Sequence, residues 1–135
     1  MTNSTSPKWL NITLWVAQAL ISLTLIWGAY AKLLLPIEET AKMLPWAKDN
    51  PDLLKFTGLI DLLGGLGIIL PTAFRMQPRL TIFAAYGTIA LMILASIFHI
   101  SRGEASLIGM NIFFLILAAF VAWGRTKKAP ILPKN

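Results

Sequence analysis

Long apolar stretches separated by short polar segments predict four membrane-spanning helices. The apolar runs cover residues 10–35, 53–70, 80–100 and 105–123. At 1.5 Å per residue the last three helices would be about 27–32 Å long, close to the ~30 Å hydrocarbon core of a bilayer. The first would reach about 39 Å and can span with tilt. Because the second and third connections are short, the helices should run antiparallel to their neighbours in an all-α, up-down-up-down bundle that forms one domain over residues 1–135.

Prolines mark the expected ends of these helices. Pro36 follows the first run, and Pro71 is expected to end the second, because proline cannot donate a helical backbone hydrogen bond. Asn50 is a candidate N-cap with Pro51 at the first helical position. Pro78 is expected to open the third helix.

The composition points to lipid as the solvent of the chain. Apolar residues make up 56% and charged residues 13%, whereas soluble domains carry about 25% charged residues. With no cysteine, the chain has no disulfide, no thiolate nucleophile and no ligand set for an iron–sulfur cluster. The net charge is +6, but the basic residues flank the apolar runs rather than forming a stripe with aromatics. We therefore read them as determinants of membrane topology, not as a nucleic-acid site.

The basic residues are distributed unequally between the two ends of the predicted bundle. The segments near both termini and the second connection carry seven basic residues and no acid: Lys8, Arg75, Arg79, Arg125, Lys127, Lys128 and Lys134. The other end mixes five basic residues with five acids. The positive-inside rule predicts that both termini are cytoplasmic. The long connection, residues 36–52, then becomes an outer loop, in which residues 37–44 can form a short amphipathic helix at the interface.

Each predicted helix carries one stripe of small and polar residues. Membrane helices pack through such residues, so the stripes should face the interior. The four stripes are Gln18, Ser22, Leu25, Ala29 and Lys32; Thr57, Gly58, Asp61, Gly64 and Gly65; Thr88, Met92, Ala95, Ser96 and His99; and Asn111, Ala118 and Ala122.

Four polar residues of these stripes are expected to converge in the outer half of the bundle: Lys32, Asp61, His99 and Asn111. A carboxylate buried in a membrane either pairs with a cation or takes up a proton, and Lys32 and His99 are the candidate partners of Asp61. Structural roles are the alternatives: Asp61 can be an interhelical hydrogen-bonding group, Lys32 can extend to the headgroups, and His99 can cap its helix.

Secondary candidates are Gln18, Tyr30, Arg102 and Glu104. Gln18, like Asn111, is expected to hold helices together, and Arg102 with Glu104 to form a solvated ion pair. One histidine without cysteine predicts no metal site, and bis-histidine haem is impossible. No catalytic residue set is recognisable, so the sequence does not decide whether the protein is an enzyme.

In their order and spacing these residues resemble the DoxX-like family of small four-helix membrane proteins. The resemblance covers roughly residues 15–125. It rests on GAYAKL at 28–33, FTGLIDLLGGLGIILP at 56–71, PRLT at 78–81, His99, RGE at 102–104, Asn111 and WGR at 123–125. The family more often carries glutamate where this chain has Asp61.

The resemblance implies a multi-pass protein of the bacterial cytoplasmic membrane. Relatives are associated with quinone-linked sulfur oxidation and with membrane oxidoreductase complexes. The first functional hypothesis is therefore an accessory subunit of a membrane oxidoreductase that contacts a quinone, with no covalently bound cofactor. Two alternatives stay open: a membrane assembly or scaffold factor whose polar core is purely structural, and a small proton-coupled transporter acting as a homo-oligomer.

Overall fold

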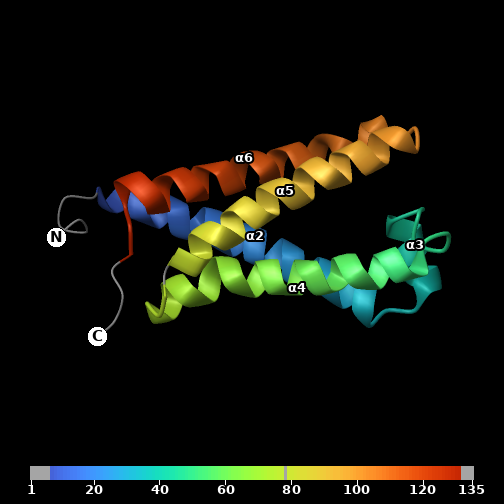
Figure 1. The fold of residues 1–135 in the computed structure, drawn as a ribbon, viewed down its shortest axis with the longest axis horizontal. Coiled ribbons are helices and arrows are strands. Elements are labelled where there is room, and N and C mark those ends of the chain that lie inside the picture. Colours follow the sequence, from blue (N-terminus) through green and yellow to red (C-terminus); the bar gives the residue numbers. More distant parts are fainter. Residues whose placement is uncertain (1–6, 78, 132–135) are drawn as a thin grey trace.

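Four long helices make up most of the protein. The computed structural model describes residues 7–77 and 79–131 (Figure 1). The long helices are α2 (Lys8–Leu33), α4 (Pro51–Phe74), α5 (Arg79–Ser101) and α6 (Gly109–Trp123). Shorter elements are α3 (Ile37–Met43), the 3₁₀ helix η1 (Ala105–Ile108) and the π-helical turn η2 (Gly124–Lys128). Pro78 and Lys134 lie outside the described residues.

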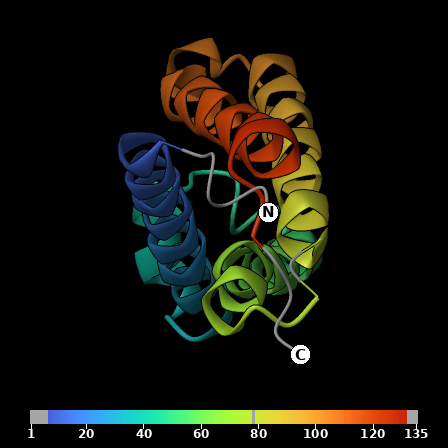
Figure 2. The same ribbon diagram turned by 90° about the vertical axis from the view of Figure 1, so that its left-hand side faces the viewer.

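The long helices alternate in direction, as the sequence predicts. Figure 1 shows α2 and α5 running one way and α4 and α6 the other. Seen end-on in Figure 2, α2 packs on α4, α4 on α5 and α5 on α6, and α6 returns to α2. We call the end where α2 begins and α6 ends the terminal end, and the end that carries α3 the loop end.

All four long helices are long and apolar enough to cross a membrane: Lys8–Leu33, Pro51–Phe74, Arg79–Ser101 and Gly109–Lys128, which joins α6 to η2. Their outward faces carry large apolar side chains, such as Leu23, Leu63 and Leu94, that are 64–71% exposed. Side chains of this kind on every helix would be costly in water and suit contact with lipid. The protein is therefore an all-helical bundle of the membrane type.

Small residues bring α2 and α4 into close contact. A Cβ atom at Gly65 would lie 2.8 Å from Ile26 Cγ1 and 3.2 Å from the backbone oxygen of Ser22. The Ser22 hydroxyl donates a hydrogen bond of 2.8 Å to the Gly65 carbonyl. Buried residues of the predicted stripes, including Leu25 and Ala29 on α2, occupy the interior. The stripes therefore identified the inward faces correctly.

The expected end of the second helix at Pro71 is wrong. α4 continues through Pro71 to Phe74 and ends at Arg75, whose φ of 53° is left-handed. The Met76 amide then donates to the Pro71 carbonyl at 3.2 Å and satisfies one of the last helical acceptors. Proline removes one donor from a helix but does not terminate it when tertiary packing holds the helical path, as is common in membrane helices.

Two elements expected at the loop end are present in the structure. Residues 37–43 form the short helix α3, which is anchored by the Thr40 hydroxyl donating to the Ala31 carbonyl at 2.6 Å. Pro51 is the first residue of α4, and Asn50 occupies the N-cap position. The Asn50 side-chain oxygen accepts no capping hydrogen bond from α4, however, and its side-chain nitrogen donates to the Trp46 carbonyl at 3.3 Å. The fourth predicted span begins as the 3₁₀ turn η1 before α6.

Candidate functional site

A cavity of about 540 Å³ lies in the loop-end half of the bundle. Its walls come from the second half of α2, the first half of α4, the second half of α5, the start of α6 and the connection after α3. Most lining side chains are apolar, and the four main candidates from the sequence all contribute polar groups: Lys32, Asp61, His99 and Asn111. The structure thus brings these four residues to one cavity.

Lys32 and Asp61 form an ion pair inside the bundle. The Lys32 ammonium donates to Asp61 Oδ2 at 2.8 Å, and the two side chains are 15% and 6% exposed. Gly28 makes room for the carboxylate, because a Cβ atom there would lie 3.1 Å from Asp61 Oδ2. A Cβ atom at Gly58 would likewise lie 3.0 Å from Lys32 Cβ. The glycines on the facing helices therefore let a charged pair form where bulkier residues would separate it.

His99 does not pair with Asp61, so this part of the expectation is wrong. Its Nδ1 contacts Glu104 Oε1 at 3.0 Å. The chain turns back after α5, where the Glu104 amide donates to the His99 carbonyl at 2.7 Å. This turn places the Glu104 carboxylate against the imidazole ring. His99 therefore lines the cavity, and its ring is positioned by the contact between Nδ1 and Glu104.

Arg102 and Glu104 form more than the solvated pair expected from the sequence. The Arg102 Nε atom donates to Glu104 Oε2 at 3.2 Å, while the other carboxylate oxygen contacts His99. The Glu104 side chain is only 17% exposed. The hydrogen bond with His99 and, secondarily, the bond to Arg102 lower the pKa of the Glu104 carboxyl from its ordinary value. Glu104 therefore carries its negative charge beside His99.

Two buried donors at the cavity have no hydrogen-bond acceptor among the described residues. They are Asn111 Nδ2 and Trp46 Nε1, and both residues line the cavity. Leaving a buried donor unpaired costs about 1–3 kcal/mol. The sequence indicated Asn111, but it gave no sign that Trp46 is buried, because an aromatic residue after a proline in a loop suits a surface equally well. A ligand carbonyl is the kind of group that such donors bind.

The secondary candidates Gln18 and Tyr30 lie away from this cavity. The Gln18 amide nitrogen donates to the Ile68 carbonyl at 2.7 Å, so Gln18 joins α2 to α4 as expected of a helix-packing residue. Tyr30 is 44% exposed on the outer face of α2, with its ring 5.6 Å from that of Trp27.

Arg125 is the polar residue whose place the sequence misjudged most. By its sequence position Arg125 counts among the charges that flank the membrane helices, but the residue is buried, with only 3% exposed. It lies at the terminal end, where its Nε donates to Gln18 Oε1 at 2.8 Å. Its position directly after an apolar run was compatible with either burial or exposure, and only the packing of η2 against α2 decides between them.

Four apolar helices that enclose buried polar groups, including a buried ion pair, define a small multi-pass membrane protein of the helical-bundle class. Residues 16–121 match the model of the DoxX-like family. The chain belongs to this family, in agreement with the resemblance of its motifs. No curated protein and no solved structure matches it.

Proposed function

We propose that the loop-end cavity binds a lipophilic molecule with carbonyl acceptors, such as a quinone, and that the protein serves as an accessory subunit of a membrane oxidoreductase. The observation that carries the proposal is a mostly apolar cavity in which the Asn111 and Trp46 donors have no acceptor among the described residues. Ligand sites are typically apolar cavities of about 300–1,000 Å³ with a few well-placed polar groups.

The charged residues of the cavity supply a reason for a quinone rather than an inert lipid. Reduction of a quinone to a quinol consumes two protons, so a site that favours it needs groups that exchange protons. The Lys32–Asp61 pair and His99 line the same cavity. In this proposal Asn111 and Trp46 donate hydrogen bonds to a quinone carbonyl oxygen, and the charged residues deliver protons to the quinone oxygens as the ring is reduced.

An accessory role follows from what the sequence lacks. It has no cysteine and one histidine, so it has no ligand set for an iron–sulfur cluster or for bis-histidine haem. In the proposal, electrons reach the quinone from a partner protein. We further propose the bacterial cytoplasmic membrane as the location and the terminal end as the cytoplasmic side, which the excess of basic residues at that end supports.

Thermal unfolding of the detergent-purified protein with ubiquinone and menaquinone analogues tests ligand binding. A saturable rise of the unfolding midpoint is expected for the native chain, because a ligand that binds only the folded state stabilises it. Asn111→Leu and Asp61→Asn should lose this rise. Thr13→Val is the control, because it removes an exposed polar group at the terminal end and should keep the rise. No rise in the native chain, or an equal rise in all variants, would overturn quinone binding.

Chemical crosslinking in native membranes tests the accessory role. An oxidoreductase subunit among the crosslinked proteins is expected, and its absence together with no quinone response would remove the proposal.

The scaffold alternative is favoured by one observation: the Lys32–Asp61 pair is complete at 2.8 Å without a ligand. In that case Asp61→Asn would lower stability and leave partner binding intact. A pH-dependent flux that Asp61→Asn abolishes would instead indicate transport.

A further inference from the structure

A buried arginine lies at the terminal end, far from the loop-end cavity, and no acidic side chain pairs with it within residues 7–77 and 79–131. Arg125 is 3% exposed and sits in η2, directly after α6. Its hydrogen-bond acceptors are all neutral: Gln18 Oε1 at 2.8 Å, Asn11 Oδ1 at 2.7 Å and the Ala129 carbonyl at 2.9 Å. A guanidinium keeps its charge under all ordinary conditions, so burial without an anion is costly.

The nitrogen atoms of this guanidinium group differ in their hydrogen bonding. Arg125 Nη2 is buried and has no hydrogen-bond partner in the part of the chain that the structure describes. The neighbouring groups orient the side chain firmly, since Nε and Nη1 are both bonded and the guanidinium carbon lies 5.7 Å from the centre of the Trp15 ring. The result is a fixed donor on a buried cation.

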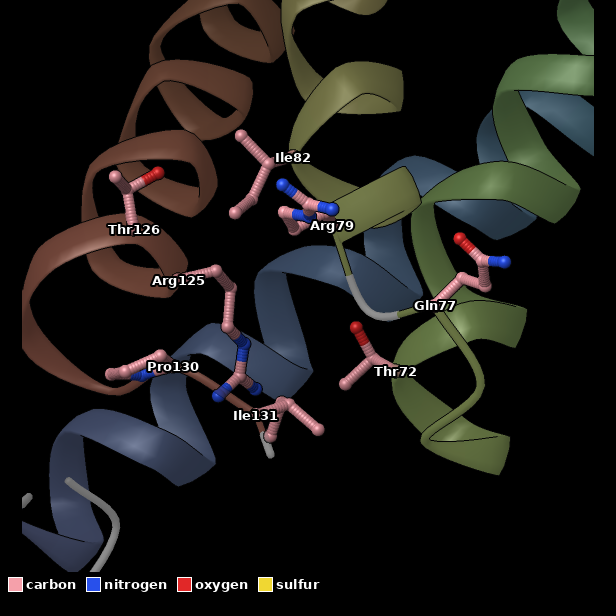
Figure 3. A pocket seen from close by; sticks show the side chains of 8 residues that line it. All are labelled: Thr72, Gln77, Arg79, Ile82, Arg125, Thr126, Pro130 and Ile131. Carbon is pink, nitrogen blue, oxygen red and sulfur yellow. The ribbon is translucent and has the colours of Figure 1, made fainter. Parts of the chain in front are cut away.

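The space beside Arg125 is large enough for a ligand. A cavity of about 570 Å³ lies between the ends of α4 and α6 and the start of α5. Figure 3 shows Arg125, Arg79, Thr72 and Thr126 around it, with the Arg125 guanidinium between Pro130 and Thr72. Arg79, Arg125 and Thr126 offer donors, whereas the Thr72 hydroxyl already contacts Thr81 Oγ1 at 2.7 Å. No acidic side chain lines the cavity within residues 7–77 and 79–131.

The wider surroundings favour a negative ligand. The segments near the terminal end carry only basic charges, and the acids of the sequence lie within residues 38–104. A guanidinium N–H that donates to a phosphate oxygen forms a charge-assisted hydrogen bond, which is about twice as strong as a neutral one. Basic pockets of this kind between membrane helices suit phosphate-bearing headgroups.

We propose that the terminal-end cavity is a phosphate-binding site, in which Arg125 Nη2 and the Arg79 side chain hold a phosphate group. The Thr126 hydroxyl is a further donor at the cavity wall. The phosphate belongs either to the headgroup of an anionic phospholipid or to a soluble phosphate, because both present the same oxygens. The site is separate from the loop-end cavity and does not depend on the quinone proposal.

Thermal unfolding of the detergent-purified full chain, at constant ionic strength, tests the site with two probes. One is inorganic phosphate against chloride, and the other is a short-chain phosphatidylglycerol against a short-chain phosphatidylcholine. A saturable rise of the midpoint is expected with phosphate or with phosphatidylglycerol. A response to the lipid at far lower concentration than to inorganic phosphate assigns the headgroup as the source, and equal responses assign a soluble phosphate.

Three variants make the test decisive. Arg79→Gln changes an exposed residue, so the chain should fold, and the apparent affinity should fall about tenfold, as expected for one charge-assisted hydrogen bond. Arg125→Gln should abolish the response if it folds. Lys127→Gln is the matched control, because it removes one exposed charge from the same end outside the cavity and should leave the affinity unchanged. No response to either probe, or equal losses in Lys127→Gln and Arg79→Gln, would overturn the proposal.

Discussion

At the scale of single residues, residue type and depth located the polar groups, and side-chain contacts decided their roles. Lys32 was one of two expected partners of Asp61, and the 2.8 Å contact selects it. His99 was the other, but the turn after α5 gives it Glu104 instead. The sequence could not predict which acid His99 contacts, because the partner depends on the path of the backbone over the few residues after α5.

The buried ion pair leads to a prediction about stability. Lys32→Met should lower the free energy of unfolding by about 3 kcal/mol, because it leaves the Asp61 carboxylate buried without its cation. The double variant Lys32→Met/Asp61→Leu should recover most of this loss, since no buried charge is left. Denaturant titration in detergent measures both.

The matched control is Lys42→Met. Its ion pair with Glu39 has side chains that are 72% and 53% exposed, and such surface pairs contribute about 0–1 kcal/mol. The prediction would be contradicted if Lys32→Met lowered the free energy of unfolding no more than the control does. It would also be contradicted if the double variant were no more stable than Lys32→Met alone.

At the scale of helices, periodicity identified the inward stripes, and proline was a weaker guide. The stripe of glycines on α4 meets α2, as small residues at membrane helix interfaces do. Pro71, in contrast, lies inside α4. Local sequence predicts where a helix loses a hydrogen bond, but the contacts of the following turn determine whether the helix continues.

The glycine stripe leads to a second prediction. Gly65→Ala should lower the free energy of unfolding by about 1–3 kcal/mol, because the added methyl group meets Ile26 and the backbone of Ser22 and forces the two helices apart. Gly87→Ala is the control, because a Cβ atom there has no other group within 4 Å among the described residues. It should be neutral or stabilising by up to about 1 kcal/mol, since alanine favours helix more than glycine does. Equal effects of the two changes in thermal unfolding would contradict close packing at Gly65.

At the scale of the whole molecule, the unequal distribution of charge predicts its orientation. Lys48 is exposed at the loop end, and Lys127 is exposed at the terminal end. Because the native chain has no cysteine, each can be replaced singly by cysteine and probed with a membrane-impermeant thiol reagent. Lys48→Cys should be labelled in intact spheroplasts, and Lys127→Cys only after the membrane is disrupted. The reverse pattern would invert the topology and place the phosphate site on the outer side.

The sequence by itself determined the number of membrane helices, their alternating directions, their inward faces and the set of polar residues at the loop end. These follow from the length of apolar runs and from helical periodicity, both of which are local properties of the chain. Only the tertiary structure decided which groups are paired, as Lys32 is with Asp61 and His99 with Glu104. It also decided that donors of Trp46 and Arg125 have no acceptor within residues 7–77 and 79–131. The physical reason is that burial and hydrogen bonding depend on neighbours from other helices, so Arg125 at the end of an apolar run is a surface charge or a buried cation according to what packs over it.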